Sequence, residues 1–441
     1  MTADLGARLA EVAKQGERLP EMYGAIDFDM PPERFAGAPD DETELDDAVE
    51  RARVLADPRL MAMMRAYCLR GDPVADAYAA LIPRVGFRRL VQMLVAACDL
   101  GLEAVPDAPP ELGALLADME RVPQWLDRAM VEEGARYDRN MTVNLLPFIM
   151  QVGFVGTFMN KYAALPMALT GTLSSETARR RVLDTSTFMM TTALPGALER
   201  FGPGFKACAM VRVMHSMVRF NTLRSGAWDP VVFGLPIPQV DQMPAGLALV
   251  TIMSRGVLKS GRRMFTHAER ARVELARYRC FLLGLPEDLL PDTPQGLVDI
   301  MTARNATLRR GFDEAICGGL VRATLAADLA PDARFISRLR QQLSYSFGKL
   351  FFLREYARGD SKMAASFGVR LTPGDWSRIA VAGVLIASTM AMHGLAARIG
   401  LFRRVSDRIL TRRLQAILQS YGHAEFSTDA DAYRRRSSRT A

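Results

Sequence analysis

The sequence predicts an all-α protein, and three observations support that prediction. Alanine, leucine, methionine and arginine, which favour helices, dominate the composition. Apolar residues recur at intervals of three and four, which is the spacing of one helix face. No segment alternates apolar and polar residues as a half-buried strand does. We therefore expect helices alone to form the core.

Length and composition limit the classes of function. The 441 residues allow one large domain or two to three ordinary ones, and 49% hydrophobic with 24% charged residues is typical of a folded soluble protein. The net charge is +7, but the basic residues are spread among acidic ones. A nucleic acid is therefore not an expected partner.

Cysteine usage and the amino terminus predict where the protein works. The five cysteines form no CxxC pair, and their odd number favours reduced thiols. The amino terminus lacks a charged segment followed by an apolar one, so export is not predicted. We expect a cytoplasmic protein, with peripheral membrane association as an open possibility.

Helices separated by proline-rich breaks are expected in the amino-terminal half. Pro83 predicts a kink, and PDAPPE at residues 106–111 is a clear break. Residues 141–160 carry no charge and predict one apolar helix. The expected helices cover residues 5–17, 44–69, 74–102, 111–121, 123–139, 141–160 and 175–192.

The carboxyl-terminal half is expected to be equally helical. Pro236, Pro238 and Pro244 predict an extended loop through GLPIPQVDQMP, because proline disfavours helix. Thr266 and Glu269 stand at the spacing of a capping box. The expected helices cover residues 204–224, 246–258, 266–283, 294–310, 336–358, 372–401 and 404–421, and the polar, basic segment 425–441 is expected to be disordered.

Two apolar stretches are long enough to cross a membrane. Residues 141–160 carry no charge, and residues 379–397 contain no Arg, Lys, Asp or Glu. Both stretches contain glycine and polar side chains, which favours buried core helices. Membrane association through 379–397 remains an alternative.

His215, one of four histidines, lies in the middle of the expected helix 204–224. At 100° per residue, Val211 and Val218 flank it on one side and Arg212 and Arg219 on the other. A neutral imidazole nitrogen binds haem iron, apolar side chains cover the porphyrin, and an arginine pairs with a propionate. The alternative is a hydrogen-bonded core histidine beside a solvated arginine edge.

The helix before His215 carries a second candidate face. Arg181, Thr185, Phe188 and Thr192 fall within one stripe about 60° wide. A haem needs a second wall, whose donors steer dioxygen while apolar groups exclude water. The alternative is that Arg181 belongs to a solvated arginine run and that Thr185 bonds to its own helix backbone.

These motifs, in this order, resemble those of the latex-clearing protein (rubber oxygenase) family, which includes the mpaB-type ER-bound oxygenases. The resemblance covers about residues 147–310. It rests on Arg181-x-x-x-Thr185, VRVMHSMVR around His215, Trp228, PIPQVDQ, and RYRCFLLGLPEDLLPDTP at residues 277–294.

The resemblance implies a haem b bound through His215, a globin-like helical core with flanking helices, and oxygen-dependent oxidation of a hydrophobic, isoprenoid or lipid-like substrate. It places Arg181 and Thr185 in the distal haem pocket, where we assign them catalytic roles. Together with the helix geometry, it predicts that Arg212, Arg219 and Phe188 also contact the haem.

The sequence departs from the rubber-cleaving pattern at two places. Asp184 stands where rubber-cleaving members carry a lysine just before the threonine. Their glutamate base is expected on the preceding helix, but here no carboxylate occurs between Asp138 and Glu176. Cleavage of a C=C bond therefore remains open.

We expect four consecutive segments: an amino-terminal helical extension (1–110), a haem-binding oxygenase-like core (111–330), carboxyl-terminal helices packed on the core (331–424) and the basic tail (425–441). Two other classes of function remain open. One is a helical scaffold or membrane-associated binding protein without a cofactor, and the other is a haem sensor without turnover. The sequence does not predict the oligomeric state.

Overall fold

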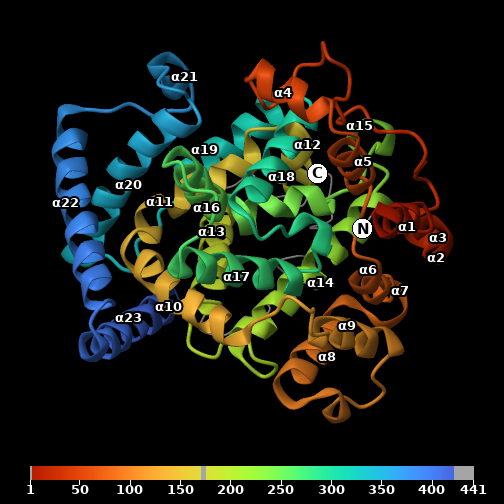
Figure 1. Cartoon of the computed structure of the whole chain (residues 1–441), viewed down its shortest axis with the longest axis horizontal. Helices are drawn as coiled ribbons and strands as arrows, with labels where there is room; N and C mark the ends of the chain where they lie inside the picture. Colours follow the sequence, from red (N-terminus) through yellow and green to blue (C-terminus); the bar gives the residue numbers. More distant parts are fainter. Residues whose placement is uncertain (1, 170–174, 422–441) are drawn as a thin grey trace, which may run out of the picture. The chain divides into compact units, whose positions relative to one another are not determined.

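The computed structural model describes residues 2–169 and 175–421, and the regular elements in these residues are all helices (Figure 1). The β contacts in this part of the chain are two isolated bridges, Phe35 to Leu308 and Thr43 to Arg309. The predicted all-α class is confirmed. The globin-like arrangement remains a prediction, and segment 425–441 lies outside the described residues.

The described chain divides into two compact units, each built from segments distant in the sequence. The first unit contains the residues up to Gly134 together with Leu198–Gly311, and the second contains Ala135–Ala197 together with residues 312–421. These units differ from the consecutive segments 1–110, 111–330 and 331–424 that we predicted. The reason is that the chain leaves the first unit within one helix, α10 (Arg128–Asn144), and later returns to it.

Helix α14 is the central helix of the first unit. It contacts α6, α8 and α17, and most of its residues are buried. Aspartates cap the short helices α4, α5 and α6, because Asp47, Asp57 and Asp72 accept the first free amide hydrogens. The elements of this unit are α1 (Thr2–Ala13), α2 (Gln15–Arg18), α3 (Pro20–Tyr23), α4 (Ala48–Leu55), α5 (Pro58–Tyr67), α6 (Pro73–Ala79), α7 (Ile82–Val85), α8 (Phe87–Leu100), η1 (Leu102–Ala104), α9 (Pro110–Glu120), α14 (Pro203–Arg224), α15 (Pro230–Phe233), α16 (Gln239–Lys259), α17 (His267–Leu282), η3 (Glu287–Leu289) and α18 (Pro294–Thr307).

Two larger apolar clusters lie in the described part of the second unit. One joins α11, α19 and α20 around Val155, Val321 and Phe352, and the other joins α13 to α23 through Met190 and Leu414. The elements of this unit are α11 (Leu146–Val155), η2 (Gly156–Phe158), α12 (Lys161–Leu169), α13 (Ser175–Thr191), η4 (Glu314–Gly318), α19 (Gly319–Leu325), α20 (Phe335–Glu355), α21 (Ser361–Ser366), α22 (Pro373–Ala396) and α23 (Gly400–Tyr421).

The apolar stretch 141–160 is not one helix, which corrects our prediction. Helix α10 ends at Asn144, and the chain bends by 87° before α11 continues. Pro147 lies in the first turn of α11, where its missing N–H costs nothing. Proline disrupts the interior of a helix but is tolerated in its first turn. Pro147 therefore lies at the start of a new helix and not within a single helix 141–160.

The segment around Pro244 also differs from the prediction, because α16 begins at Gln239 and includes this proline. Proline inside a helix removes the hydrogen bond to the carbonyl four residues earlier, here that of Val240. Arg304 Nε donates to this carbonyl at 3.1 Å. A tertiary contact thus satisfies the group that Pro244 leaves free. The predicted Thr266–Glu269 capping box, in contrast, is present in front of α17.

We had expected residues 379–397 to form a buried core helix. Helix α22 is instead exposed along one face. Val384 is 71% exposed and Leu395 is 62% exposed. By length and composition α22 could cross a membrane, and within the described residues the only other candidate is α10 taken together with Leu146–Phe158, across the bend.

Candidate functional site

His215 lies on the one accessible stripe in the middle of α14. Its neighbours Arg212, Met214 and Ser216 are buried, whereas His215, Val211 and Val218 remain partly accessible. These three residues share one helix face, because they are spaced at intervals of four and three. The helix therefore presents an imidazole between two valines.

A series of amides orients the His215 ring. Gln239 Nε2 donates to the Gly71 carbonyl at 3.0 Å, so Gln239 Oε1 is left to accept from Gln242 Nε2 at 3.1 Å. Gln242 Oε1 then lies 3.0 Å from His215 Nδ1. An oxygen acceptor requires the proton on Nδ1, so Nε2 carries the lone pair. Nε2 has no hydrogen-bond partner among the described residues.

The environment keeps this imidazole neutral. Burial lowers the pKa of His215 to about 4, and the positive charge of Arg219 acts in the same direction against the hydrogen bond to Gln242. At neutral pH the ring is therefore uncharged, which is the form that binds a metal.

Arg212 and Arg219 do not form the solvated edge that the alternative interpretation required, because only 3% and 0% of their side-chain surfaces are exposed. Arg212 pairs with Asp72 and, at 2.7 Å, with Asp118. Arg219 pairs with Asp76. The two guanidinium groups that we expected to meet haem propionates are thus paired with carboxylates inside the protein, and Arg212 Nη1 is left without a hydrogen-bond partner among the described residues.

Backbone and hydroxyl groups complete this ion-pair network. Arg219 also donates to the carbonyls of Pro236 at 3.0 Å and Ile237 at 2.6 Å. The Tyr23 hydroxyl donates to the second oxygen of Asp76. Although burial alone would raise it, the adjacent Arg212 guanidinium holds the pKa of Asp72 below its usual range.

Gly284, within the segment 277–294, allows the network to close. Its φ is +85°, and a Cβ atom there would lie 2.3 Å from Asp72 Oδ2 and 2.6 Å from Arg212 Nε. Only glycine fits, because any side chain would displace the Asp72 to Arg212 pair.

The second predicted set lies on α13, in the second unit. Arg181 and Thr185 are half-buried, Phe188 is 9% exposed, and Arg181 Nη1 contacts Met167 Sδ. Thr192 Oγ1 donates to the Met189 carbonyl at 3.0 Å, the backbone bond that we had considered for Thr185. The predicted stripe of α13 is therefore partly accessible and is not a solvated arginine run.

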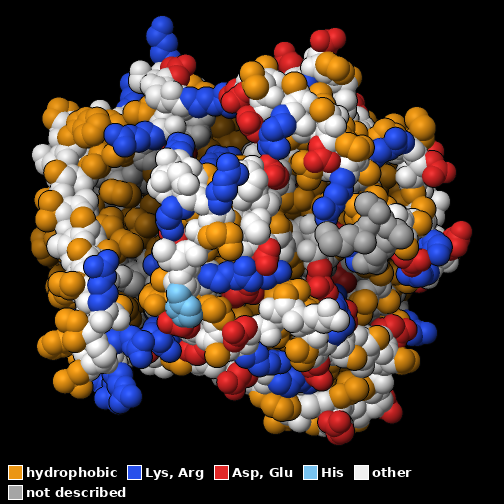
Figure 2. Space-filling view, viewed as in Figure 1, with side chains coloured by type: hydrophobic (Ala, Val, Ile, Leu, Met, Phe, Trp, Pro, Cys, Tyr) orange, Lys and Arg blue, Asp and Glu red, His pale blue; other side chains and the backbone are white. Residues whose placement is uncertain are grey.

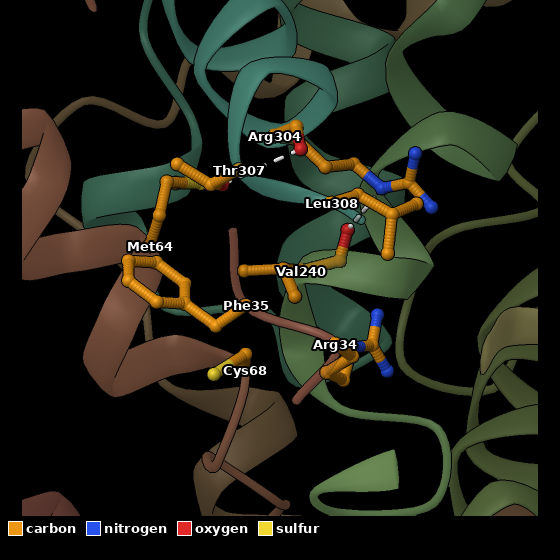
Figure 3. Close-up of a pocket in the computed structure, with 8 residues that line it drawn as sticks. All are labelled: Arg34, Phe35, Met64, Cys68, Val240, Arg304, Thr307 and Leu308. Atoms are coloured by element: carbon orange, nitrogen blue, oxygen red, sulfur yellow. Dashed lines mark hydrogen bonds between the residues drawn. The ribbon is translucent and has the colours of Figure 1, made fainter. Parts of the chain in front are cut away.

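A small cavity in the first unit, shown in Figure 3, fits water only. Its volume is about 10 Å³, enough for about one molecule. Arg34 Nη1 is buried beside it without a partner among the described residues, so a water molecule would satisfy this donor. The Cys68 thiol also lines the cavity, and burial raises its pKa to about 12. This thiol is not a nucleophile at neutral pH.

Other metal chemistry has no support in the described residues. No group of three or more His, Cys, Asp or Glu side chains there could hold a metal ion. All five cysteines are buried and none forms a disulfide, in agreement with the predicted reduced thiols. His267 is bound to Glu133 at 2.7 Å, and its side chain is 64% exposed. His393 is buried, with Nδ1 2.7 Å from the Ser406 hydroxyl and Nε2 without a hydrogen-bond partner among the described residues. Among the described histidines, His215 is the one that lies partly accessible between valines on a helix face.

Sequence reasoning missed Gln242 and the aspartates of the network. Gln239 and Gln242 belong to the PIPQVDQ motif, but its three-residue spacing does not show which ring the amides reach. Asp72 and Asp76 lie far from His215 in the sequence, and Asp72 looks only like a helix cap. Their pairing with arginines is a tertiary contact.

We expect Arg219→Met to lower the free energy of unfolding by about 3–5 kcal/mol, because Asp76 then stays buried without its cation. Urea unfolding followed by circular dichroism measures the change. Arg224→Met, an exposed position on the same helix, is the matched control and should change it by less than about 0.5 kcal/mol. Adding Asp76→Asn to Arg219→Met should restore part of the stability. Equal effects of Arg219→Met and Arg224→Met would contradict the structural role.

Comparison with known proteins identifies the family. A family model described as ER-bound oxygenase mpaB/B'/rubber oxygenase, catalytic domain, matches residues 141–387, more than half of the chain. The rubber oxygenase of Streptomyces sp. (strain K30) is 21% identical over 283 residues, which cover 58% of this chain and 69% of that protein. The solved structure of latex clearing protein LCP in the closed state has the same fold, with a TM-score of 0.51 and 16% identity over 78% of this chain and 90% of that one. The predicted resemblance is confirmed and extends further towards the carboxyl terminus than we expected. The chain belongs to the mpaB/B'/rubber oxygenase family and is an oxygenase by that membership.

Proposed function

We propose that this oxygenase depends on haem b and uses dioxygen to oxidise a hydrophobic substrate. The observation that carries the proposal is the 3.0 Å contact between His215 Nδ1 and Gln242 Oε1, from which the tautomer of His215 follows. Its Nδ1–H is used by Gln242, so its Nε2 lone pair is left on the accessible stripe of α14. A histidine with this arrangement is suited to bind iron.

Two features of the surroundings of His215 support haem binding there. Val211, one turn before His215, and Val218, one turn after it, provide an apolar surface along the same flank of the ring. The lowered pKa keeps the imidazole neutral and able to donate its lone pair. When bound, the haem would supply the redox chemistry by which dioxygen reacts with an organic substrate.

The side chains of this protein have separate tasks in the proposal. His215 holds the iron, Gln242 fixes the orientation and protonation of its ring, and the two valines exclude water. We assign Arg181 and Thr185 to the side on which dioxygen reacts, where they donate hydrogen bonds, and Phe188 to the apolar wall. This second assignment rests on the sequence motif and on the accessible face of α13.

A hydrophobic substrate, isoprenoid or lipid-like, is the substrate class that we propose. The relatives are named for rubber and latex, which are apolar polyisoprenes. We do not extend the proposal to cleavage of a C=C bond, because Asp184 and the carboxylate-free segment 139–175 depart from the rubber-cleaving pattern. Oxygen consumption with candidate lipids separates turnover from the alternative of a haem sensor.

We expect His215→Ala to abolish the haem absorption at about 400 nm of the protein purified with adequate iron, because the iron loses its protein ligand. The matched control is His267→Ala, which removes an exposed imidazole and should leave the spectrum unchanged. A band of full intensity in His215→Ala would refute the ligand assignment.

Gln242→Leu should weaken haem binding by about 10- to 100-fold while leaving the fold intact, because the His215 ring loses the acceptor that selects its tautomer. Haem titration into the apoprotein measures the affinity, and circular dichroism checks the fold. Gln242→Glu keeps an oxygen acceptor at this position and should bind more tightly than Gln242→Leu. Unchanged haem affinity in Gln242→Leu would show that the hydrogen bond from His215 to Gln242 does not orient the ring for iron binding.

The haem affinity of the apoprotein should stay constant from pH 7 to about 5. A proton competes with iron for Nε2 only near the pKa of His215, which burial lowers to about 4. Below that pH the affinity should fall about tenfold per pH unit. A histidine with the ordinary pKa of 6.5 would lose affinity below pH 6.5. A loss of about fivefold between about pH 6.5 and 5.5, with unchanged circular dichroism, would contradict the lowered pKa.

A further inference from the structure

Helix α22 has one face held firmly by the second unit. Its buried residues Asp375, Ile379, Ala382, Ile386 and His393 fall on a single stripe. Asp375 accepts hydrogen bonds from Ser346 at 2.8 Å and Lys349 at 3.1 Å on α20. His393 Nδ1 lies 2.7 Å from the Ser406 hydroxyl on α23. These contacts fix which face of α22 points outward.

The outward face is apolar, whereas a surface helix is normally polar there. Val381, Val384, Leu385, Met392 and Leu395 lie within an arc of about 100° opposite the buried stripe. They are 57%, 71%, 47%, 56% and 62% exposed. Figure 2 shows hydrophobic side chains along the edge formed by α22.

The apolar surface continues onto the first half of α23. Leu401, Phe402, Val405 and Ile409 share an arc of about 100° and are 41–74% exposed. The opposite side of α23 packs through Leu410 and Leu414. We call the exposed apolar side chains from Val381 to Ile409 the outer patch.

The outer patch is bordered by positive charge. Residues 376–421 contain seven arginines and one acidic residue, Asp407. That carboxylate is bound to Arg139 at 2.9 Å. Arg404, Arg408 and Arg412 are exposed along one edge of the apolar arc of α23. Exposed apolar side chains beside cations are typical of helices that bind anionic lipid surfaces.

We propose that the outer patch docks this protein on the surface of an anionic lipid bilayer. Helices α22 and α23 lie in the plane of the interface, the apolar side chains enter the headgroup and acyl boundary, and the arginines contact lipid phosphates. Two signals, apolar area and basic charge, act together, as stable peripheral binding requires.

Two other occupants fit the observations less well. A membrane-spanning α22 would have to expose Asp375 and His393, which are 1% and 3% exposed in their contacts with α20 and α23, to lipid. A second copy of this chain, in a two-fold dimer, would bring the same arginine rows together. Anionic lipid complements the charge that a second copy would repel.

Flotation of the full-length protein with lipid vesicles tests the proposal. We expect at least tenfold stronger partition into phosphatidylcholine vesicles with about 30 mol% phosphatidylserine than into phosphatidylcholine alone, weakening as salt rises. Leu395→Glu/Leu401→Glu should reduce this partition at least tenfold. The matched control is Val49→Glu/Val231→Glu, at positions that are 78% and 75% exposed in the first unit, and it should bind like the unmodified protein. Every variant keeps the arginine-rich segment after residue 421, so a loss reports on the outer patch.

Three results would overturn the proposal. The first is equal partition into both kinds of vesicle or none, and the second is an equal loss in the two double variants. The third is evidence that something other than a lipid surface covers the outer patch. Resistance to alkaline carbonate extraction would indicate that α22 spans the membrane. A dimer that Leu395→Glu/Leu401→Glu converts to a monomer would indicate that a second copy of the chain binds there. Circular dichroism confirms that each variant is folded.

Discussion

The hydrogen bond between His215 Nδ1 and Gln242 Oε1 is the interaction on which the site depends. It leaves a histidine in an apolar helix with one defined lone-pair nitrogen, which is what the proposed haem site requires. The acceptor can be an oxygen only because Gln239 uses the other end of the Gln242 amide and is itself anchored on the Gly71 backbone. Helices α14 and α16 and the loop at Gly71 thus together determine which nitrogen of the His215 ring carries the proton.

Burying two arginines on the same helix creates a second requirement. A buried cation is tolerated only when carboxylates and further hydrogen bonds replace the lost water. Asp72 and Asp76, both on or next to α6, supply the carboxylates for Arg212 and Arg219. The network ties α6 to α14 and leaves the accessible stripe of α14 without charge. An uncharged face with two valines beside a neutral imidazole is the result, and it supports the proposed haem site.

The proposed roles of the outer patch and of the His215 site are compatible with each other. An oxygenase for an apolar substrate works on molecules that gather in or near lipid, and a face that binds a bilayer would bring the protein to that material. The two features belong to different structural units and rest on separate observations. The tautomer of His215 supports the first, and the exposure and charge of α22 and α23 support the second.

The sequence by itself determined the all-α class, the family, the helix around His215 and its flanking valines, because helix periodicity is local and the motifs are short. Only the tertiary structure decided the roles of Gln242, Asp72 and Asp76, since their partners lie far away along the chain. Periodicity placed Arg212 and Arg219 beside the histidine but could not show that carboxylates already neutralise them. It also could not show that Arg304 satisfies the carbonyl freed by Pro244, or that the apolar helix α22 keeps one face outside the core. Burial and hydrogen-bond partners depend on what packs against a helix, and a single sequence records only the helix.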